Sequence, residues 1–298
     1  VVASYQLSGG VTSFSISTPL VLNTANNFTA TAKDVANNES SSASVSIINE
    51  DNINPSIISY TLDNSVISPN TSSGIKDTAS FNLAFSEEVN TTMDIVNSSG
   101  NLIKAIYSSS AVTNPGAKTW DGKNTASVYV VDGVYTIKIV LTDKAGNSIT
   151  DTIKTITVDN TAPTVALTYG VNPAKAGSEI VTATYSEPVV GTPQISIDQP
   201  GSTDIANVAM TATADSKVWI YQYIVSIANG GTYIDGTAMV SLSPVTDVAG
   251  NVAGVPTGNS FTIDTTPPIA SITSPSADSV VKNVNGDVSL AFNSTGGS

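Results

Sequence analysis

A pair of acidic marks recurs along this chain at nearly constant spacing, and it limits the possible folds more than any other feature. The first mark is a short turn sequence that starts with Asp and ends with Asn, at residues 34–38, 143–147 and 247–251. The second mark is an Asp close to a Pro, about 16 residues later, at Asp51, Asp159 and Asp264. Because the pairs return about every 105 residues, the sequence predicts domains joined in a line by short connections.

This period divides the chain into four parts. Residues 53–159 and residues 160–264 each have the length of a whole repeat. Residues 1–52 carry both marks and are predicted to be the C-terminal part of a repeat, whereas residues 265–298 are predicted to start a further one. We therefore expect the natural protein to be longer than this chain.

Composition excludes several classes of function. The formal net charge is −13, and all eleven cationic side chains are Lys. An acidic surface repels nucleic acid and attracts divalent cations, so no nucleic-acid partner is expected. The chain has no Cys and no His, which removes disulfides, thiolate nucleophiles and the commonest general base. No pair of carboxylates suited to glycoside hydrolysis is visible, so no catalytic role is expected.

The location is predicted to be extracellular, at the cell surface. Charged residues make up only 12% of the chain, and Ser, Thr and Asn supply most of its polarity, which suits an exposed β-rich protein. No apolar run approaches the roughly 18 residues that a membrane span needs, so no membrane insertion is expected within this segment.

Strand patterns dominate, and no window shows a helical period. Residues 134–142 alternate, with Tyr135, Ile137, Ile139 and Leu141 on one face, as in a half-buried strand. Short strands with frequent turn signals, in units of about 100 residues, indicate an all-β chain of tandem Ig-like antiparallel β-sandwiches. Without a disulfide, each core is expected to pack around aromatic side chains, notably Trp120 and Trp219.

Residues 53–159 resemble the Ig-like domain of flagellar hook-capping proteins and related bacterial surface modules. The matching segments are 67–70, 75–77, 96–102, 119–123, 132–135 and 143–147. The segment Asn70–Gly74 departs from this family, which often carries an acidic, Gly-rich loop there.

Residues 160–264 resemble the bacterial Ig-like repeats of large adhesins and S-layer-associated proteins. The similarity lies in segments 161–163, 185–189 and 245–251, and residues 85–89 match the second of these within the preceding repeat. In such adhesins, the resemblance implies, the acidic marks bind calcium at or near the domain joints and stiffen the protein.

The acidic marks therefore have two interpretations. Calcium takes 6–8 oxygen ligands from carboxylates, amides, carbonyls and water, and the predicted ligands are Asp34 and Asp51 at one joint, Asp143, Asn147 and Asp159 at the next, and Asp247, Asn251 and Asp264 at the third, with Glu87 or Glu187 as further ligands. Alternatively, each Asp only caps backbone N–H groups in a tight turn without any metal. Both interpretations stay open on the sequence alone.

The preferred functional hypothesis is a non-catalytic shaft of a bacterial adhesin, S-layer component or surface filament, with calcium-stiffened joints. Its partners would be neighbouring repeats or other copies of the chain, and a host or surface ligand at a distal tip outside this segment. One alternative is a filament subunit that polymerises head to tail, with residues 269–298 of one copy completing residues 1–52 of the next by strand addition. Another is a carbohydrate- or protein-binding module, although the stripe of Trp219, Tyr221 and Tyr223 is expected to be core.

Overall fold

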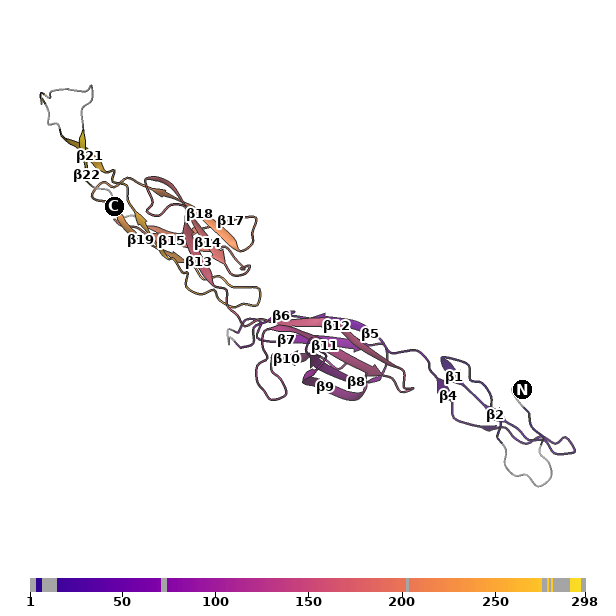
Figure 1. Ribbon diagram of the computed structural model, residues 1–298. Coiled ribbons are helices and arrows are strands. Elements are labelled where there is room, and N and C mark those ends of the chain that lie inside the picture. Colours follow the sequence, from indigo (N-terminus) through magenta and orange to yellow (C-terminus); the bar gives the residue numbers. More distant parts are fainter. Residues whose placement is uncertain are drawn as a thin grey trace. The chain divides into compact units, whose positions relative to one another are not determined.

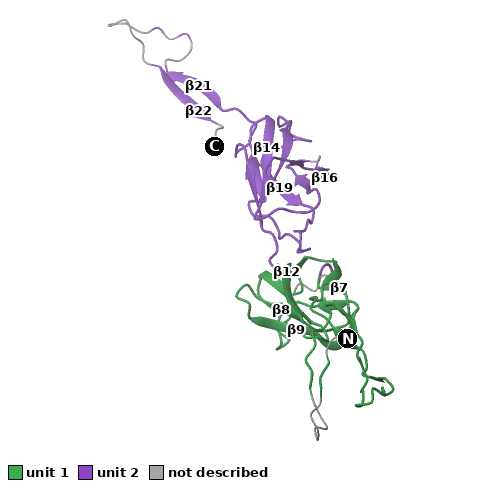
Figure 2. Ribbon diagram, turned by 90° about the vertical axis from the view of Figure 1, so that its right-hand side faces the viewer, with its two compact units in different colours: residues 1–70, 77–158 green, residues 71–76, 159–298 purple. Residues whose placement is uncertain are grey.

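The computed structural model describes residues 4–6, 15–70, 74–201, 204–274, 278, 280 and 290–295. All regular secondary structure in these residues is β-strand. The chain separates into two compact units, residues 1–70 with 77–158 (unit 1) and residues 71–76 with 159–298 (unit 2), as Figure 2 shows. The described part of the chain contains no helix long and apolar enough to cross a membrane.

Unit 1 is built around one β-sandwich (Figure 1). Its strands are β1 (Thr24–Asn26), β2 (Thr29–Ala30), β3 (Ala43–Ser44), β4 (Ile48–Glu50), β5 (Ile57–Leu62), β6 (Val66–Ile67), β7 (Ala79–Phe85), β8 (Val89–Val96), β9 (Leu102–Val112), β10 (Lys118–Trp120), β11 (Gly133–Thr142) and β12 (Ser148–Val158). One sheet has the order β10-β7-β5 and the other the order β6-β12-β11-β8-β9. Neighbouring strands are antiparallel except β6 and β12, which are parallel.

The core of unit 1 lies between these two sheets. On β11 the residues from Tyr135 to Leu141 alternate between buried and half-buried, as the sequence predicts. The same alternation on β7 turns Phe81, Leu83 and Phe85 into the core. Trp120 is 1% exposed, and its ring packs edge to face on Tyr135 with 5.3 Å between the ring centroids. This confirms that aromatic packing takes the place of a disulfide.

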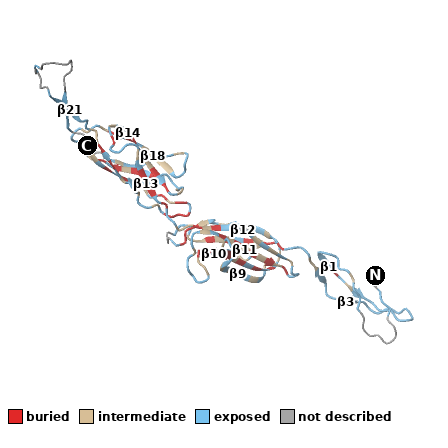
Figure 3. Ribbon diagram, viewed as in Figure 1, coloured by how far each residue is buried: buried red, intermediate tan, exposed pale blue. Residues whose placement is uncertain are grey.

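The first part of unit 1 has no such core. Strand β1 pairs with β4, and β2 pairs with β3, so that residues 24–50 form a hairpin closed by the Asp34 turn. Nearly all of its residues are exposed (Figure 3). It is the segment predicted to be part of a repeat.

Unit 2 contains a second sandwich. Its strands are β13 (Val165–Tyr169), β14 (Gly177–Tyr185), β15 (Gln194–Asp198), β16 (Ile205–Ala209), β17 (Thr211–Ala212), β18 (Val218–Val225), β19 (Gly236–Leu242), β20 (Ser260–Ile263), β21 (Ile269–Ser274) and β22 (Ala291–Thr295). The two sheets have the orders β13-β14-β18-β17 and β16-β15-β19-β20. Strands β21 and β22 form a separate antiparallel hairpin.

The core of unit 2 includes Tyr185, Ile195, Ile197, Tyr223 and Phe261. Trp219 and Tyr221 are partly buried and pack against this cluster, so the aromatic stripe on β18 belongs to the core, as expected. The prediction of an all-β chain of antiparallel, Ig-like sandwiches is confirmed.

Candidate metal centres

The Asp-to-Asn sequences form one kind of turn, and that turn is used more widely than the sequence pattern indicates. In each copy, the side-chain Oδ1 of the first residue accepts a hydrogen bond from the backbone N–H four residues later. The first residues are Asp34, Asn97, Asn124, Asp143, Asn229 and Asp247. Three of the six begin with Asn, so the turn needs a side-chain oxygen but not a negative charge. Turn formation therefore explains the shape of these segments without explaining why some of them carry Asp.

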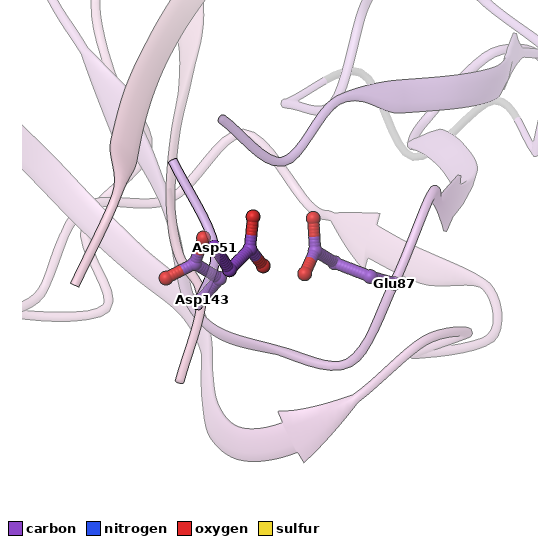
Figure 4. Close-up of side chains that lie close together, drawn as sticks. All are labelled: Asp51, Glu87 and Asp143. Carbon is purple, nitrogen blue, oxygen red and sulfur yellow. The ribbon is translucent and has the colours of Figure 1, made fainter. Parts of the chain in front are cut away.

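At Asp143 the turn brings its carboxylate to two others. Carboxylate oxygens of Asp51, Glu87 and Asp143 all lie within 4.8 Å of one another, and Figure 4 shows the three side chains close together. Asp51 lies in the segment that leads into β5, Glu87 in the loop between β7 and β8, and Asp143 directly after β11. The group therefore sits at the end of the sandwich where the chain enters it.

Two sets of hydrogen bonds hold this first group in place. Ser86 donates its backbone N–H to the Ser56 carbonyl, and its Oγ accepts the Ser56 N–H, both at 2.9 Å. This double link fixes the loop that carries Glu87 against the lead-in segment. On the other side, Asn147 Nδ2 donates to the Asp51 carbonyl at 3.0 Å and to Asp143 Oδ2 at 2.8 Å.

Unit 2 contains the same arrangement. Oxygens of Asp159, Glu187 and Asp247 also lie within 4.8 Å of one another. Ser186 makes the same double link to Thr164, with the Thr164 N–H donating to Ser186 Oγ at 3.0 Å. Asn251 Nδ2 donates to the Asp159 carbonyl at 2.9 Å and to Asp247 Oδ2 at 2.7 Å. One chain thus builds the three-acid group twice, from matching positions of two repeats.

Electrostatics at both groups disfavour a third negative charge. Burial raises the pKa of Glu87, and the nearby charges of Asp51 and Asp143 raise it further. Burial likewise raises the pKa of Glu187, with added contributions from Asp159 and Asp247 that Lys217 partly offsets. These directions are those expected when carboxylates share a small space and their charges are not fully neutralised.

The pKa of Asp143 shifts in the opposite direction, because its carboxylate accepts hydrogen bonds within the turn. Burial opposes ionisation of this carboxyl, but hydrogen bonds from the Asn147 side chain and from the backbone N–H groups of Ala145, Gly146 and Asn147 outweigh burial, so the pKa is lowered. Asp143 is therefore a negative charge fixed in position beside Glu87.

Each group offers the carboxylate oxygens that calcium binds. Each Ca–O distance is about 2.3–2.6 Å, so oxygens on opposite sides of one ion are up to about 5 Å apart, whereas magnesium at about 2.0–2.1 Å would require about 4 Å. The three oxygens of each group lie within 4.8 Å of one another, so all three could contact one calcium ion. Water and backbone carbonyls would have to supply the remaining ligands.

The predicted pairing of the acids is wrong. The sequence analysis joined Asp143 with Asp159 and Asp247 with Asp264, each about 16 residues apart. Asp143 precedes β12 and Asp159 follows it, and the 11 residues of this strand, at about 3.3 Å per residue, separate the two by roughly 36 Å. Asp34 and Asp51 likewise lie at opposite ends of the strands that follow the first turn. Asp51 and Asp159 instead join the turns of the repeats that they precede.

The remaining predicted residues are placed as follows. Asn147 and Asn251 direct an amide N–H toward the group, so they position carboxylates. In the described residues, no group of three candidate ligands includes Asp34 or Asp264. Asp34 closes the hairpin of residues 24–50, and Asp264 accepts a backbone hydrogen bond from Thr266 at 3.2 Å.

Sequence reasoning named Glu87 and Glu187 only as additional ligands and missed the role of Ser86 and Ser186. The signal was present, since Phe85-Ser86-Glu87 and Tyr185-Ser186-Glu187 repeat an aromatic residue, Ser and Glu. The aromatic residue is buried in the core in both repeats. The Ser that follows it bridges to the lead-in segment, and the Glu after that reaches the acidic group.

Among known proteins, the chain is similar to solved structures but matches no family model or curated sequence. A tetra-tandem repeat in the extending region of a large adhesion protein is 15% identical, with a TM-score of 0.35, over 87% of this chain and 61% of that one. This chain therefore spans less than two thirds of that structure.

Two further solved structures are similar at the same level. A structure concerned with host cell surface retention of a 1.5-MDa bacterial ice-binding adhesin is 16% identical, with a TM-score of 0.35, over 80% of this chain and 74% of that one. Fibronectin(III)-like modules of Clostridium thermocellum CbhA are 15% identical, with a TM-score of 0.32, over 70% of this chain and 94% of theirs. Identities and scores of this size do not bear on function.

Proposed function

We propose that this chain is a non-catalytic segment of the shaft of a bacterial surface adhesin, in which each complete repeat binds one calcium ion where its lead-in segment meets the sandwich. The observation that carries the proposal is the twofold construction of the same three-acid group, with matching Ser and Asn contacts, in two repeats that otherwise differ in sequence. An extracellular location, where calcium is abundant, follows from the same proposal.

Calcium at this position would act on the joint and not on the core. Asp51 belongs to the segment before β5, whereas Glu87 and Asp143 belong to the sandwich. An ion that binds all three joins the lead-in segment to the sandwich and removes the repulsion among the carboxylates. Pro55 restricts the backbone a few residues further on. Together these contacts would reduce bending at the point where the chain enters each repeat.

A carbohydrate-binding module is less well supported. Binding of sugars by stacking needs aromatic rings that face solvent together, whereas the rings of Trp219 and Tyr221 pack against the core. The exposed aromatic side chains in the described residues are Tyr5, Tyr129 and Phe292, which come from separate parts of the chain.

The proposal is tested by measuring the number of calcium ions bound to the full chain with isothermal titration calorimetry. Wild type is expected to bind two ions, because two acidic groups are present. Glu87→Gln and Glu187→Gln are each expected to abolish one site, and the double variant to abolish both.

Glu88→Gln is the matched control, because Glu88 is the exposed neighbour of Glu87 and belongs to neither group. This variant should keep both sites. Absence of binding at millimolar calcium, or equal stoichiometry in wild type and the double variant, would refute the metal sites.

A further inference from the structure

The chain that enters the sandwich of unit 1 is also bonded to the β1–β4 hairpin before it, through Asn23. The Asn52 backbone N–H donates to Asn23 Oδ1 at 2.8 Å. Asn23 in turn donates its own backbone N–H to Glu50 Oε2 at 2.5 Å. Because Thr24 pairs with Glu50 across the hairpin, Asn23 stands just before this strand pair and bonds to the chain two residues beyond it. The hairpin therefore holds the residue that directly follows Asp51.

Asp51 itself is bonded to the sandwich. Its carbonyl accepts the Asn147 side chain at 3.0 Å, and its carboxylate lies beside those of Glu87 and Asp143 (Figure 4). Its Oδ1 also accepts the Ile53 backbone N–H at 2.9 Å. Two consecutive residues thus bond to different parts of unit 1, the first to the sandwich and the second to the hairpin. No residue of the chain separates these two attachments.

The chain that leaves the sandwich of unit 2 is held in the same way. Gly236 pairs with Ile263, and Asp235 precedes this pair. Asp235 Oδ1 accepts the Thr265 backbone N–H at 2.9 Å and the Thr265 hydroxyl at 2.7 Å. Asn23 and Asp235 therefore hold matching register positions, each bonded to the N–H two residues beyond the strand pair. We call this bond the exit clamp.

The backbone at Asn23 shows which part of the residue the exit clamp needs. Asn23 has a φ of 52°, in the left-handed region that Gly and Asn adopt more readily than most other residues. Gly would fit this backbone but would offer no acceptor to the Asn52 N–H. Asn23→Gly therefore removes the bond without straining the chain.

We propose that Asn23 is a positioning residue for the calcium site that contains Asp51, and that it couples this site to the repeat before it. This inference rests on the proposed function. The exit clamp restricts Asn52, and with it the neighbouring Asp51, so less conformational entropy is lost when an ion binds the carboxylate. Because such coupling is reciprocal, calcium at this site also strengthens the bond between Asn52 and Asn23.

The test is isothermal titration calorimetry of the full chain with calcium in the Glu187→Gln background, which leaves only the site at Asp51. Asn23→Gly is expected to weaken calcium binding about threefold to tenfold, as the loss of one hydrogen bond implies. Asn23→Asp keeps a side-chain acceptor, as Asp235 does at the matching position, and is expected to keep the affinity of the background.

Asn114→Gly is the matched control. Asn114 Oδ1 accepts the Gly116 N–H at 3.0 Å, in the loop between β9 and β10, so this substitution also removes a bond from an Asn side chain to the backbone of unit 1. It does not touch the chain around Asp51 and should leave the calcium affinity unchanged.

A second measurement follows the exit clamp itself. Hydrogen exchange of the Asn52 amide, recorded by NMR spectroscopy, is expected to slow when calcium is added to the Glu187→Gln chain. In Asn23→Gly this amide should exchange faster in EGTA, and calcium should slow it less. Asn23 belongs to neither of the two sandwich cores, so protection of the β11 amides should be the same in both chains.

The outcomes separate this inference from the function on which it rests. Equal calcium affinity with and without Asn23→Gly, a loss of affinity in Asn23→Asp as large as in Asn23→Gly, or an Asn52 amide that calcium does not slow would overturn the positioning role and leave the calcium site in place. Absence of calcium binding in the Glu187→Gln background itself would refute the proposed function, and the positioning role with it.

Discussion

Asp247 allows the turn-forming role and the metal-binding role of an acidic residue to be separated. Its side chain is 2% exposed, and Oδ1 accepts the backbone N–H groups of Gly250 at 2.7 Å and Asn251 at 2.9 Å. Asp247→Ala removes the acceptor of the Asn251 N–H and, at Oδ2, an acceptor of Asn251 Nδ2 at 2.7 Å, at about 1–3 kcal/mol each. The Gly250 N–H keeps only its longer bond to the backbone carbonyl of residue 247 at 3.3 Å. Asp247→Asn keeps an oxygen in the same place, as Asn229 does in another turn of unit 2.

The two substitutions should therefore differ when calcium is absent. In EGTA, Asp247→Ala is expected to lower the free energy of unfolding of unit 2 by about 2–4 kcal/mol, which corresponds to a fall in Tm on the order of 10–30 °C. Asp247→Asn is expected to change this free energy by less than about 1 kcal/mol. In excess calcium both variants should lack the rise in Tm that ligand binding gives unit 2 of the wild type.

Differential scanning calorimetry in EGTA and in excess calcium measures both effects, with the transition of unit 1 as an internal reference. Asn229→Ala is the matched control, because it removes a turn acceptor in unit 2 without touching a carboxylate. That variant should lose stability and keep the calcium-dependent rise. The reasoning is refuted if Asp247→Asn keeps the full calcium-dependent rise, or if it destabilises unit 2 in EGTA as much as Asp247→Ala does.

Three further predictions concern the cores and the ionisable groups. Trp120→Ala should destabilise unit 1 by about 3–5 kcal/mol in urea denaturation, because it empties the centre of the core; a loss below about 1 kcal/mol would contradict the packing described. Burial raises the pKa of Tyr60 and of Tyr169 to about 12, so the stability that these neutral phenols contribute is complete below pH 10 and is lost as pH rises from about 10 towards 12. Ultraviolet difference absorbance measures the ionisation of the phenols, and a titration in which every Tyr ionises near the ordinary pKa of 10.0 would contradict this prediction. Hydrogen bonds from Thr266 and Thr265 lower the pKa of Asp235, so its contribution is present above its ordinary value of 3.8 and is lost as pH falls through the lowered value. Replacing both Thr residues by Val should move the acid unfolding of unit 2 to higher pH in circular dichroism, and an unchanged midpoint would exclude this role.

The fold could be predicted from the sequence because its signals are local. The alternation from Tyr135 to Leu141 specifies which side of one strand faces the core. This can be read from the residues of that strand alone. The turns can also be predicted from local sequence. Asp supplies the hydrogen-bond acceptor, and Gly adopts the positive φ that the turn requires, as at Gly146 with φ of 100°.

The acidic groups could not be predicted in the same way, because their members are distant in the sequence. Asn147 and the Asp51 carbonyl that it contacts are 96 residues apart, and Asn251 and the Asp159 carbonyl are 92 residues apart. Nearness in sequence favoured Asp159 as the partner of Asp143, but an extended strand places such residues at opposite ends of a sandwich. Only the order of strands within the sheets decides which loops meet at one end.

In the proposed function, calcium fixes each lead-in segment to its own sandwich and so stiffens the chain. Small-angle X-ray scattering of the full chain, in excess calcium and in EGTA, tests it most directly, with the Glu87→Gln, Glu187→Gln double variant measured alongside. Calcium is expected to increase the maximum dimension and to narrow the distribution of interatomic distances for wild type but not for the double variant. Identical scattering of wild type with and without calcium, under conditions where calorimetry shows both sites filled, would contradict it.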